Sequence, residues 1–202
     1  RLILAHDVTE QEEAKNKLAA NERKFRTLIE NNYDVIALMD KSFKVIYRSP
    51  AAERVTGWTN EDMINSAALK NIHPDDVAYA RGVVDEAFKN PGKQVKNLYR
   101  MLHKKGHYIW VEGVLTNRLD DENVNAMVSN YHDVTEQKEA ERKLIESELR
   151  YRTTLDNMIE GVQIIGFDWK YIYVNDALTI QSKYSKEQMI GHTVMELYPG
   201  LE

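Results

Sequence analysis

The sequence predicts an α+β fold in which an antiparallel sheet carries helices on one face. Five stretches rich in β-branched and aromatic residues read as strands: 35–39, 43–47, 94–104, 107–119 and 124–134. Between the second and the third, Pro50, Gly57 and Pro74 stand where short helices would begin or end. Two strands, several helices and three strands follow one another within about 105 residues. That order favours one sheet packed against the helical region.

The third strand has apolar side chains on both faces, because Leu98 and Leu102 alternate with Tyr99 and Met101. One face should meet the helices of 50–90. We expect the other face to be covered by an amphipathic helix upstream, the one that bears Phe25.

The chain also repeats itself at a shift of 126 positions. His6-Asp7-Val8-Thr9-Glu10-Gln11 aligns with His132-Asp133-Val134-Thr135-Glu136-Gln137, and the register continues without a gap. The repeat divides the chain into five parts: the last strand of a preceding domain at 1–9, a linker helix at 10–30, a complete domain at 31–135, a second linker helix at 136–156, and the truncated beginning of a following domain at 157–202.

The two linker helices contain neither glycine nor proline and are rich in Glu, Lys, Arg, Ala and Leu, a composition that favours helix. Apolar positions recur at alternating spacings of four and three, which predicts a short coiled-coil seam made by Ala140, Leu144 and Tyr151 in one helix and by Leu18 and Phe25 in the other. A solvated helix that packs one stripe on its own domain is the alternative. The seam predicts a homodimer.

Composition excludes several classes of function. The net charge of −5 argues against a broad nucleic-acid surface, and the absence of cysteine removes disulfides, thiolate metal sites and cysteine nucleophiles. No apolar run reaches the roughly 20 residues of a membrane helix, so we expect no membrane contact and a cytoplasmic location. Neither a nucleotide-binding loop nor a hydrolase or zinc motif occurs, so this segment is not expected to be an enzyme or to hold a metal.

The order of short motifs resembles that of PAS domains. Ser49-Pro50-Ala51-Ala52-Glu53-Arg54-Val55-Thr56-Gly57-Trp58 follows the second strand, Ile72-His73-Pro74-Asp75-Asp76 precedes the long helix, and Asp133-Val134-Thr135 ends the last strand. The late hairpin carries Lys105-Gly106-His107-Tyr108-Ile109-Trp110, and Tyr173-Val174-Asn175-Asp176-Ala177 repeats the first motif. The sequence departs from the family pattern at Ser49, where PAS domains commonly have Asn. The corresponding residue of the second copy, Asn175, is the Asn of the family pattern.

The resemblance implies a five-stranded sheet in spatial order 2-1-5-4-3, often with a small ligand between the sheet and the helices. It implies that Asp133 and Thr135 tie the last strand to the output helix, and that Asp7 and Thr9 do so for the preceding domain. Ordinary helix capping by these short polar side chains is the plainer reading, and the two readings are compatible.

A pocket, if one forms, would have these walls: Ile36, Leu38, Val55, Trp58, Ile72, Val84, Met101 and Met127. A cysteinyl-flavin adduct is excluded, and the lack of histidine on the long helix argues against haem. Non-covalent flavin stays open because Trp58 and Trp110 could line or stack on its ring, although such aromatic residues are more often core.

The resemblance therefore implies a sensory or signal-relay module that acts through dimerising linker helices on an output domain of the same protein, a sensor histidine kinase of a two-component system. The alternatives are a module of a diguanylate cyclase and a ligand-free structural spacer that sets dimer geometry.

Overall fold

The computed structural model describes residues 9–200, which form two compact units divided between Lys138 and Glu139. Asp7 and the rest of the predicted strand at 1–9 lie outside the described residues, except Thr9, which begins the first helix. The first unit contains α1 (Thr9–Glu30), β1 (Val35–Met39), β2 (Val45–Arg48), α2 (Ala51–Thr56), α3 (Asn60–Met63), the 3-10 helix η1 (Pro74–Asp76), α4 (Val77–Lys89), β3 (Gln94–Leu102), β4 (Tyr108–Arg118) and β5 (Ala126–Asp133).

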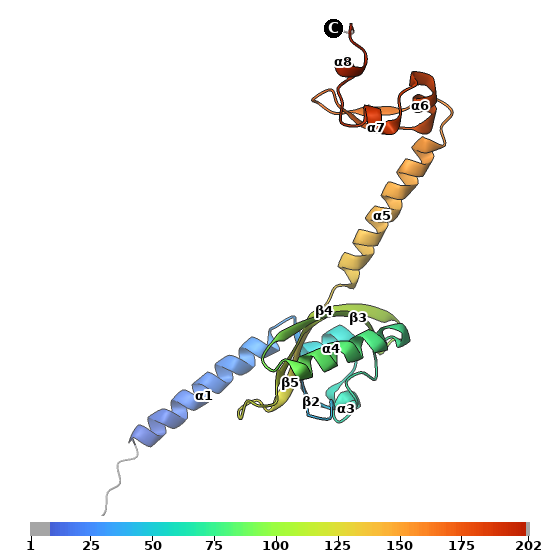
Figure 1. Ribbon diagram of the computed structural model, residues 1–202. Coiled ribbons are helices and arrows are strands. Elements are labelled where there is room, and N and C mark those ends of the chain that lie inside the picture. The colour runs from blue at the N-terminus through green and yellow to red at the C-terminus, as the bar shows by residue number, and fades with distance from the viewer. Residues whose placement is uncertain (1–8, 201–202) are drawn as a thin grey trace, which may run out of the picture. The chain divides into compact units, whose positions relative to one another are not determined.

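The five strands of the first unit form one antiparallel sheet in the order β2-β1-β5-β4-β3. Figure 1 shows α4 lying against this sheet. The fold class predicted from the sequence, an α+β PAS fold with this strand order, is confirmed. The first strand of the chain, β1, takes the second position in the sheet, and the last strand, β5, pairs with it at the centre. β5 is paired on both sides as far as Tyr131, and its last residues, His132 and Asp133, pair with β4 before the chain leaves the sheet.

The helices α2, α3 and α4 cover one face of this sheet: α2 packs against β1, α3 against β2, and α4 against β3 and β4. Gly57, with a φ of 72°, ends α2 in the left-handed conformation that favours glycine, as its position after the helix predicts. Pro74 opens η1, where a missing N–H costs no hydrogen bond. Val83, Leu115 and Met127 belong to the core between the two layers.

The opposite face of the sheet is not covered by α1, so that expectation is wrong. Phe25 and Leu28 remain 65% and 59% exposed. The register gives the physical reason, because Lys96, Arg100 and Glu112 occupy this face by alternation with the inward residues of β3 and β4. Long charged side chains shield neighbouring apolar atoms with their own stems, so the face does not require a helix over it.

The second strand begins later than predicted, at Val45 rather than at residue 43. Phe43 has a φ of 59°, which belongs to a turn, and the Asp40 carboxylate accepts hydrogen bonds from the backbone N–H groups of Ser42 (2.8 Å) and Lys44 (2.9 Å). The turn between the first two strands thus includes residues 40–44.

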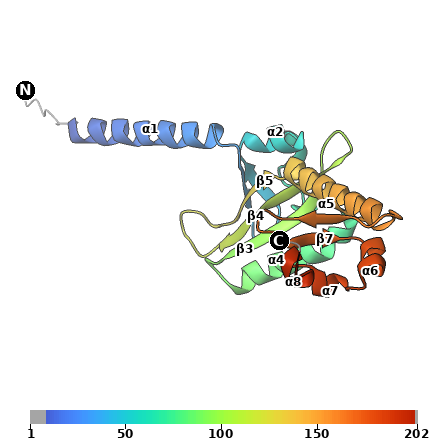
Figure 2. The same cartoon turned by 90° about the horizontal axis from the view of Figure 1, so that it is seen from above.

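The second unit contains most of α5 (Thr135–Asp156), a hairpin of β6 (Gln163–Ile165) and β7 (Tyr171–Val174), and three short helices: α6 (Asp176–Ser182), α7 (Lys186–Met189) and α8 (Val194–Leu197). These helices gather beside β7 in Figure 2, where Tyr171, Val174 and Met189 form a small core. Within the described part of this unit the sheet has two strands.

Candidate functional site

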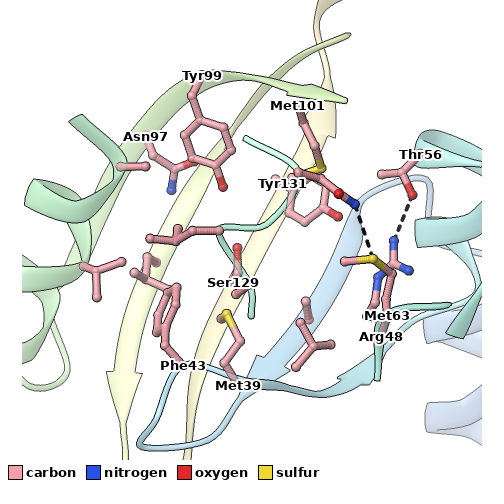
Figure 3. A pocket seen from close by; sticks show the side chains of 18 of the residues that line it. Met39, Phe43, Arg48, Thr56, Met63, Asn97, Tyr99, Met101, Ser129 and Tyr131 are labelled. Carbon is pink, nitrogen blue, oxygen red and sulfur yellow. Dashed lines mark hydrogen bonds between the residues drawn. The ribbon is translucent and has the colours of Figure 1, made fainter. Parts of the chain in front are cut away.

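A cavity of about 60 Å³ lies inside the first unit, between the sheet and the helices (Figure 3). Its walls come from all five strands, from α2, α3 and α4, and from the loops between them. Most of these residues are apolar: Ala37, Met39, Phe43, Val45, Trp58, Met63, Ala68, Leu69, Ala80, Val83, Val84, Met101 and Leu115. The polar ones are Arg48, Thr56, Asn71, Asn97, Tyr99, Ser129 and Tyr131.

The structure brings three of the eight expected pocket residues, Trp58, Val84 and Met101, to this cavity. Ile36 and Leu38 do not line it, because Val35, Ala37 and Met39 are the residues of β1 that face inward. The side chains of a strand point alternately to its two faces. Because the residues on both faces of β1 are apolar, the sequence did not show which face meets the helices. Val55, Ile72 and Met127 lie in the core or against it but outside the cavity wall: Val55 packs against the cluster around Val35, while Ile72 and Met127 are themselves buried.

The polar part of the cavity wall was not predicted from the sequence. The signal was present in β3, where Asn97 takes the alternating position between the inward residues Val95 and Tyr99. Arg48 closes β2 and is only 4% exposed, a rare environment for a guanidinium. Polar side chains at inward strand positions are the feature that could have indicated a site.

Arg48 is held by neutral acceptors. Its Nη1 donates to the backbone oxygens of Trp58 (3.1 Å) and Thr59 (3.4 Å), and its Nη2 donates to Thr56 Oγ1 (2.9 Å) and to the backbone oxygen of Ala52 (3.4 Å). Among the described residues, no carboxylate forms an ion pair with it. The cavity wall therefore carries a buried positive charge without a negative partner.

Asn97 is 4% exposed, and its side-chain oxygen has no hydrogen-bond partner among the described residues. Burial raises the pKa of Tyr99 well above its ordinary value, and burial likewise raises the pKa of Tyr131 although Arg48 acts in the opposite direction. Both phenols are thus neutral hydrogen-bond donors at physiological pH. The wall combines donors, one cation and an unsatisfied acceptor.

The two tryptophans considered for a flavin ring lie in different places. Trp58 lines the cavity, and its Nε1 donates to the backbone oxygen of Leu102 (2.9 Å). Trp110 is not part of the cavity wall; the guanidinium of Arg100 lies 5.5 Å from its ring centre. The structure therefore does not bring the pair together around one space.

The junction between β5 and α5 is the second feature of interest. The Asp133 carboxylate accepts a hydrogen bond from the backbone N–H of Thr135 (2.8 Å), and Thr135 Oγ1 accepts one from the backbone N–H of Trp110 in β4 (2.8 Å). The N–H of Val134 donates to the backbone oxygen of the same Trp110 (2.8 Å). The first residue of α5 is thus fastened to the sheet from which the helix emerges.

Trp110 also connects this junction to the helical layer. Its ring lies against Arg100, whose Nε and Nη2 donate to the two carboxylate oxygens of Asp76 at the start of α4 (2.9 Å and 2.7 Å). These hydrogen bonds lower the pKa of Asp76 from 3.8 to about 2. Asp76, Arg100, Trp110 and Thr135 form a continuous series of contacts from the helical layer to α5.

The predicted seam residues lie on the surfaces of the two long helices. Leu18, Phe25, Leu144 and Tyr151 are each about two-thirds exposed, and Ala140 is exposed as well. Spacings of seven, from Leu18 to Phe25 and from Leu144 to Tyr151, place each pair on one face of its helix. Thr9 is the first residue of α1.

Neither a metal site nor a membrane span stands out in the described part of the chain. Within residues 9–200, no three His, Cys, Asp or Glu side chains cluster as metal ligands would. None of the helices there is both long and apolar enough to cross a bilayer.

A family model and two related sequences agree with the observed fold. Residues 45–130 match the family model described as PAS fold. The chain is 24% identical over 130 residues to the sensor histidine kinase TmoS of Ectopseudomonas mendocina, covering 63% of this chain and 13% of that protein. It is 25% identical over 196 residues to the two-component sensor PprA of Pseudomonas aeruginosa, covering 94% of this chain and 21% of that protein.

A solved PAS domain from Colwellia psychrerythraea superposes with a TM-score of 0.50 at 23% identity, covering 56% of this chain and 97% of that one. The chain spans about a fifth or less of the length of the two sensor relatives. The strand order, the match over residues 45–130 and this superposition agree: the first unit of the chain is a PAS domain.

Proposed function

We propose that this segment is a sensory and signal-relay module of a sensor histidine kinase, in which the state of the PAS interior acts on α5. The observation that carries the proposal is the junction, where Thr135 hydrogen bonds to β4 while beginning the helix. The names of the two sensor relatives support a kinase as the output. We also propose a cytoplasmic location, because α5 would have to reach a kinase domain on the same side of a membrane.

The mechanism follows from what the junction fixes. A change in the curvature of the sheet moves the backbone of Trp110. The N–H of Trp110 donates to Thr135, the first residue of α5, and its carbonyl oxygen accepts from the N–H of Val134, just before the helix. A ligand can bias the helix only by binding two arrangements of this junction with different affinities. Arg100 and Asp76 give the helical layer a route to the same tryptophan.

The test compares Thr135→Val and Asp133→Ala with the unchanged protein in the intact kinase that carries this segment. Both variants keep the PAS core and remove one junction hydrogen bond, so we expect the autophosphorylation rate to shift while its dependence on ATP concentration stays the same. Lys105→Ala, in the turn after β3, serves as the control, because it lies outside the junction. Unchanged rates in both junction variants would contradict the proposal.

Dimerisation through the long helices is the second part of the proposal. Exposed apolar side chains at a spacing of seven, such as Leu144 and Tyr151, are what a two-helix seam requires. We expect Leu144→Asp to weaken self-association by about tenfold or more, since the carboxylates of two copies would face each other across an apolar seam. Sedimentation at matched concentrations measures this, with Glu141→Asp as a charge-conserving control; an unchanged dimer fraction would contradict the seam.

A further inference from the structure

The turn between β3 and β4 fastens a part of the cavity wall. The N–H of Lys104 donates to the backbone oxygen of Thr56 (3.0 Å), and the backbone oxygen of Leu102 accepts from Trp58 Nε1 (2.9 Å). Thr56, at the end of α2, and Trp58, just after it, both line the cavity. The β3–β4 turn, residues 102–107, therefore holds the end of α2 and the loop after it.

This turn is built around an uncharged imidazole. His103 Nδ1 accepts a hydrogen bond from the backbone N–H of Lys105 (3.1 Å). Because a backbone N–H can only donate, this nitrogen carries no proton and the ring is neutral. The other side of the ring lies against Gly57, where an added Cβ would be 2.8 Å from His103 Cε1 and 2.9 Å from Nε2. The neutral ring thus contacts both the turn and the end of α2.

The surroundings of His103 disfavour a proton on its ring. The ring stacks on that of His107, with 4.5 Å between the two centres. Burial is the main cause that lowers the pKa of His103 below its ordinary value of 6.5, and the charges of the neighbouring turn residues act in the same direction. The charged and titratable groups around the ring are His107, Lys105, Lys104 with its ion-pair partner Asp62 (2.6 Å), and Asp133 of β5, which favours the proton.

Three other histidines of the described chain have different neighbours. Each lies beside a carboxylate: His73 Nδ1 is 3.5 Å from Asp75, His132 Nδ1 is 3.9 Å from Asp34, and His192 Nδ1 is 3.3 Å from Glu196. A proton on one of these rings would have an anion next to it. Within residues 9–200, neither His103 nor His107 forms an ion pair of this kind. A proton on His103 would therefore meet a second imidazole instead.

We propose that the β3–β4 turn is a pH-sensitive switch, in which a proton taken from water by His103 Nδ1 weakens the hold on Thr56 and Trp58. A protonated Nδ1 is a donor, so it can no longer accept from the N–H of Lys105. The new charge also lies in the stack with a second imidazole. Because Thr56 Oγ1 and the backbone oxygen of Trp58 accept from Arg48, the change reaches the cavity wall.

The sign of the pH dependence follows from the direction of the pKa shift. The folded pKa of His103 lies below the ordinary value of 6.5, so the closed turn prefers the neutral ring. The stabilisation is therefore complete above pH 6.5 and is lost as the pH falls from 6.5 through the folded value. Mild acid loosens the turn, and a return to neutral pH closes it again.

NMR of the complete chain, titrated from about pH 8 to about pH 5 at constant ionic strength, follows the histidine rings and the amides. We expect His103 to titrate with a midpoint below 6.5, and the amides of Lys105 and Gly57 to shift with the same midpoint. Protection of the Trp58 indole N–H against hydrogen exchange, corrected for the intrinsic effect of pH, should fall by about threefold to tenfold across this range.

His103→Asn separates the proton from the hydrogen bond. An asparagine Oδ1 can accept from the N–H of Lys105 but takes up no proton in this range. The chain already has this arrangement at Asn117, whose Oδ1 accepts from the N–H of Leu119 (3.0 Å). We expect the variant to keep its turn from neutral to acidic pH, with constant protection of the Trp58 indole.

His73→Asn is the matched control. His73 Nδ1 also accepts from a backbone N–H two residues ahead, that of Asp75 (3.2 Å), but it caps η1 and lies beside the Asp75 carboxylate. This variant should keep the pH response of the unchanged protein. A second variant, His107→Gln, removes the charge of the stacked ring and should raise the His103 midpoint toward 6.5.

Three results would overturn the inference. They are a His103 midpoint at or above 6.5, turn amides that do not follow that midpoint, and a loss of Trp58 protection that persists in His103→Asn. These readouts use neither kinase activity nor the hydrogen bond of Thr135, so a failure here is separate from a failure of the relay function.

Discussion

The two units of the chain begin alike but hold their entering helices differently. At the shift of 126 positions, Ser49 corresponds to Asn175 and Ile36 to Val162. The Ser49 hydroxyl accepts a hydrogen bond from the N–H of Ile36 (3.0 Å), and the Asn175 side-chain oxygen accepts one from the N–H of Val162 (2.8 Å). The same backbone arrangement is thus fastened by a hydroxyl in one unit and by an amide in the other.

The amide does more. Asn175 also accepts from the N–H of Leu178 (3.0 Å), and its Nδ2 donates to the backbone oxygens of Leu155 (3.0 Å) and Glu160 (2.8 Å), at the end of α5 and in the loop that follows it. One buried side chain therefore joins the strand, the next helix and the entering helix.

In the first unit, an exposed residue forms the hydrogen bonds to the end of the entering helix. Arg54 in α2 donates from Nη2 to the backbone oxygens of Glu30 (3.4 Å) and Asn32 (2.8 Å), at the end of α1 and just after it. An exposed arginine holds a helix end less firmly than a buried amide, because water competes for its hydrogen bonds.

The ends of the helices differ in charge as well. Asp156 in α5 accepts from the Tyr173 hydroxyl (2.8 Å) and from Lys186 Nζ (3.0 Å), and these hydrogen bonds, chiefly that from Lys186, lower its pKa. At the corresponding positions of the first unit stand Glu30, Tyr47 and Asn60, which line an open groove instead. The end of the helix that enters the second unit is therefore tied to its neighbours more tightly than the end of the helix that enters the PAS domain.

The largest expected effect concerns β4 and β5, two adjacent strands of the first unit. A Cβ on Gly113 would lie 2.2 Å from the backbone oxygen of Asn130 and 2.6 Å from the Cβ of Tyr131. We expect Gly113→Ala to lower the free energy of unfolding of the first unit by about 3 kcal/mol. Urea unfolding followed by tryptophan fluorescence measures it.

Gly82 is the matched control. A Cβ there meets nothing within 4 Å, and the residue lies inside α4. Gly82→Ala should stabilise the same unit by about 1 kcal/mol, because alanine favours helix. Equal effects of the two substitutions would contradict the close packing of β4 on β5.

The next prediction compares the corresponding side chains Ser49 and Asn175 directly. Asn175→Ala removes all side-chain hydrogen bonds of a fully buried amide, so we expect the second unit to lose about 3 kcal/mol of stability. Ser49→Ala removes one hydrogen bond and should cost the first unit about 1 kcal/mol. Hydrogen exchange resolved by unit separates the two effects, and a larger loss in Ser49→Ala would reverse the comparison.

The smallest effect on stability is pH-dependent and belongs to the first unit. The folded pKa of Asp76 is about 2, below its ordinary value of 3.8, chiefly because Arg100 hydrogen bonds to it. The stabilisation is therefore complete above about pH 4 and is lost as the pH falls from 4 to 2. We expect Asp76→Asn to cost about 1 kcal/mol at pH 6 and only a small fraction of that at pH 2, where about half of the folded Asp76 carboxyl groups are still ionised. Urea titrations at the two pH values measure the difference, and a cost independent of pH would contradict the ion pair.

Much of the fold could be predicted from the sequence, because the alternation of apolar residues and the glycine and proline residues at helix ends are local signals. The strand order of the first unit followed from the PAS resemblance, while Gly57 and Pro74 marked helix ends by their own backbone preferences. The inward face of β1 could not be predicted, since Ile36 and Leu38 are as apolar as Val35 and Met39.

The candidate site was harder to anticipate for a related reason. Arg48 and Asn97 contribute to the cavity only because a bulge in the pairing of β1 with β2 and the register of β3 turn them inward. Register is a tertiary property, and a slip of one residue would place either side chain in water. Asp133 and Thr135 were named from the family resemblance and from their place at the start of a predicted helix, and the structure places both at the junction between β5 and α5.

The central claim is that the PAS sheet holds the first turn of α5 through Thr135, and hydrogen exchange tests it most directly. Thr135→Val keeps the shape of the side chain but removes the acceptor for the N–H of Trp110. We expect amides 136–140 to exchange several times faster in the variant, while protection within β1 and β5 stays as in the unchanged protein. Equal exchange of amides 136–140 in the two proteins would show that the sheet does not control the start of the helix.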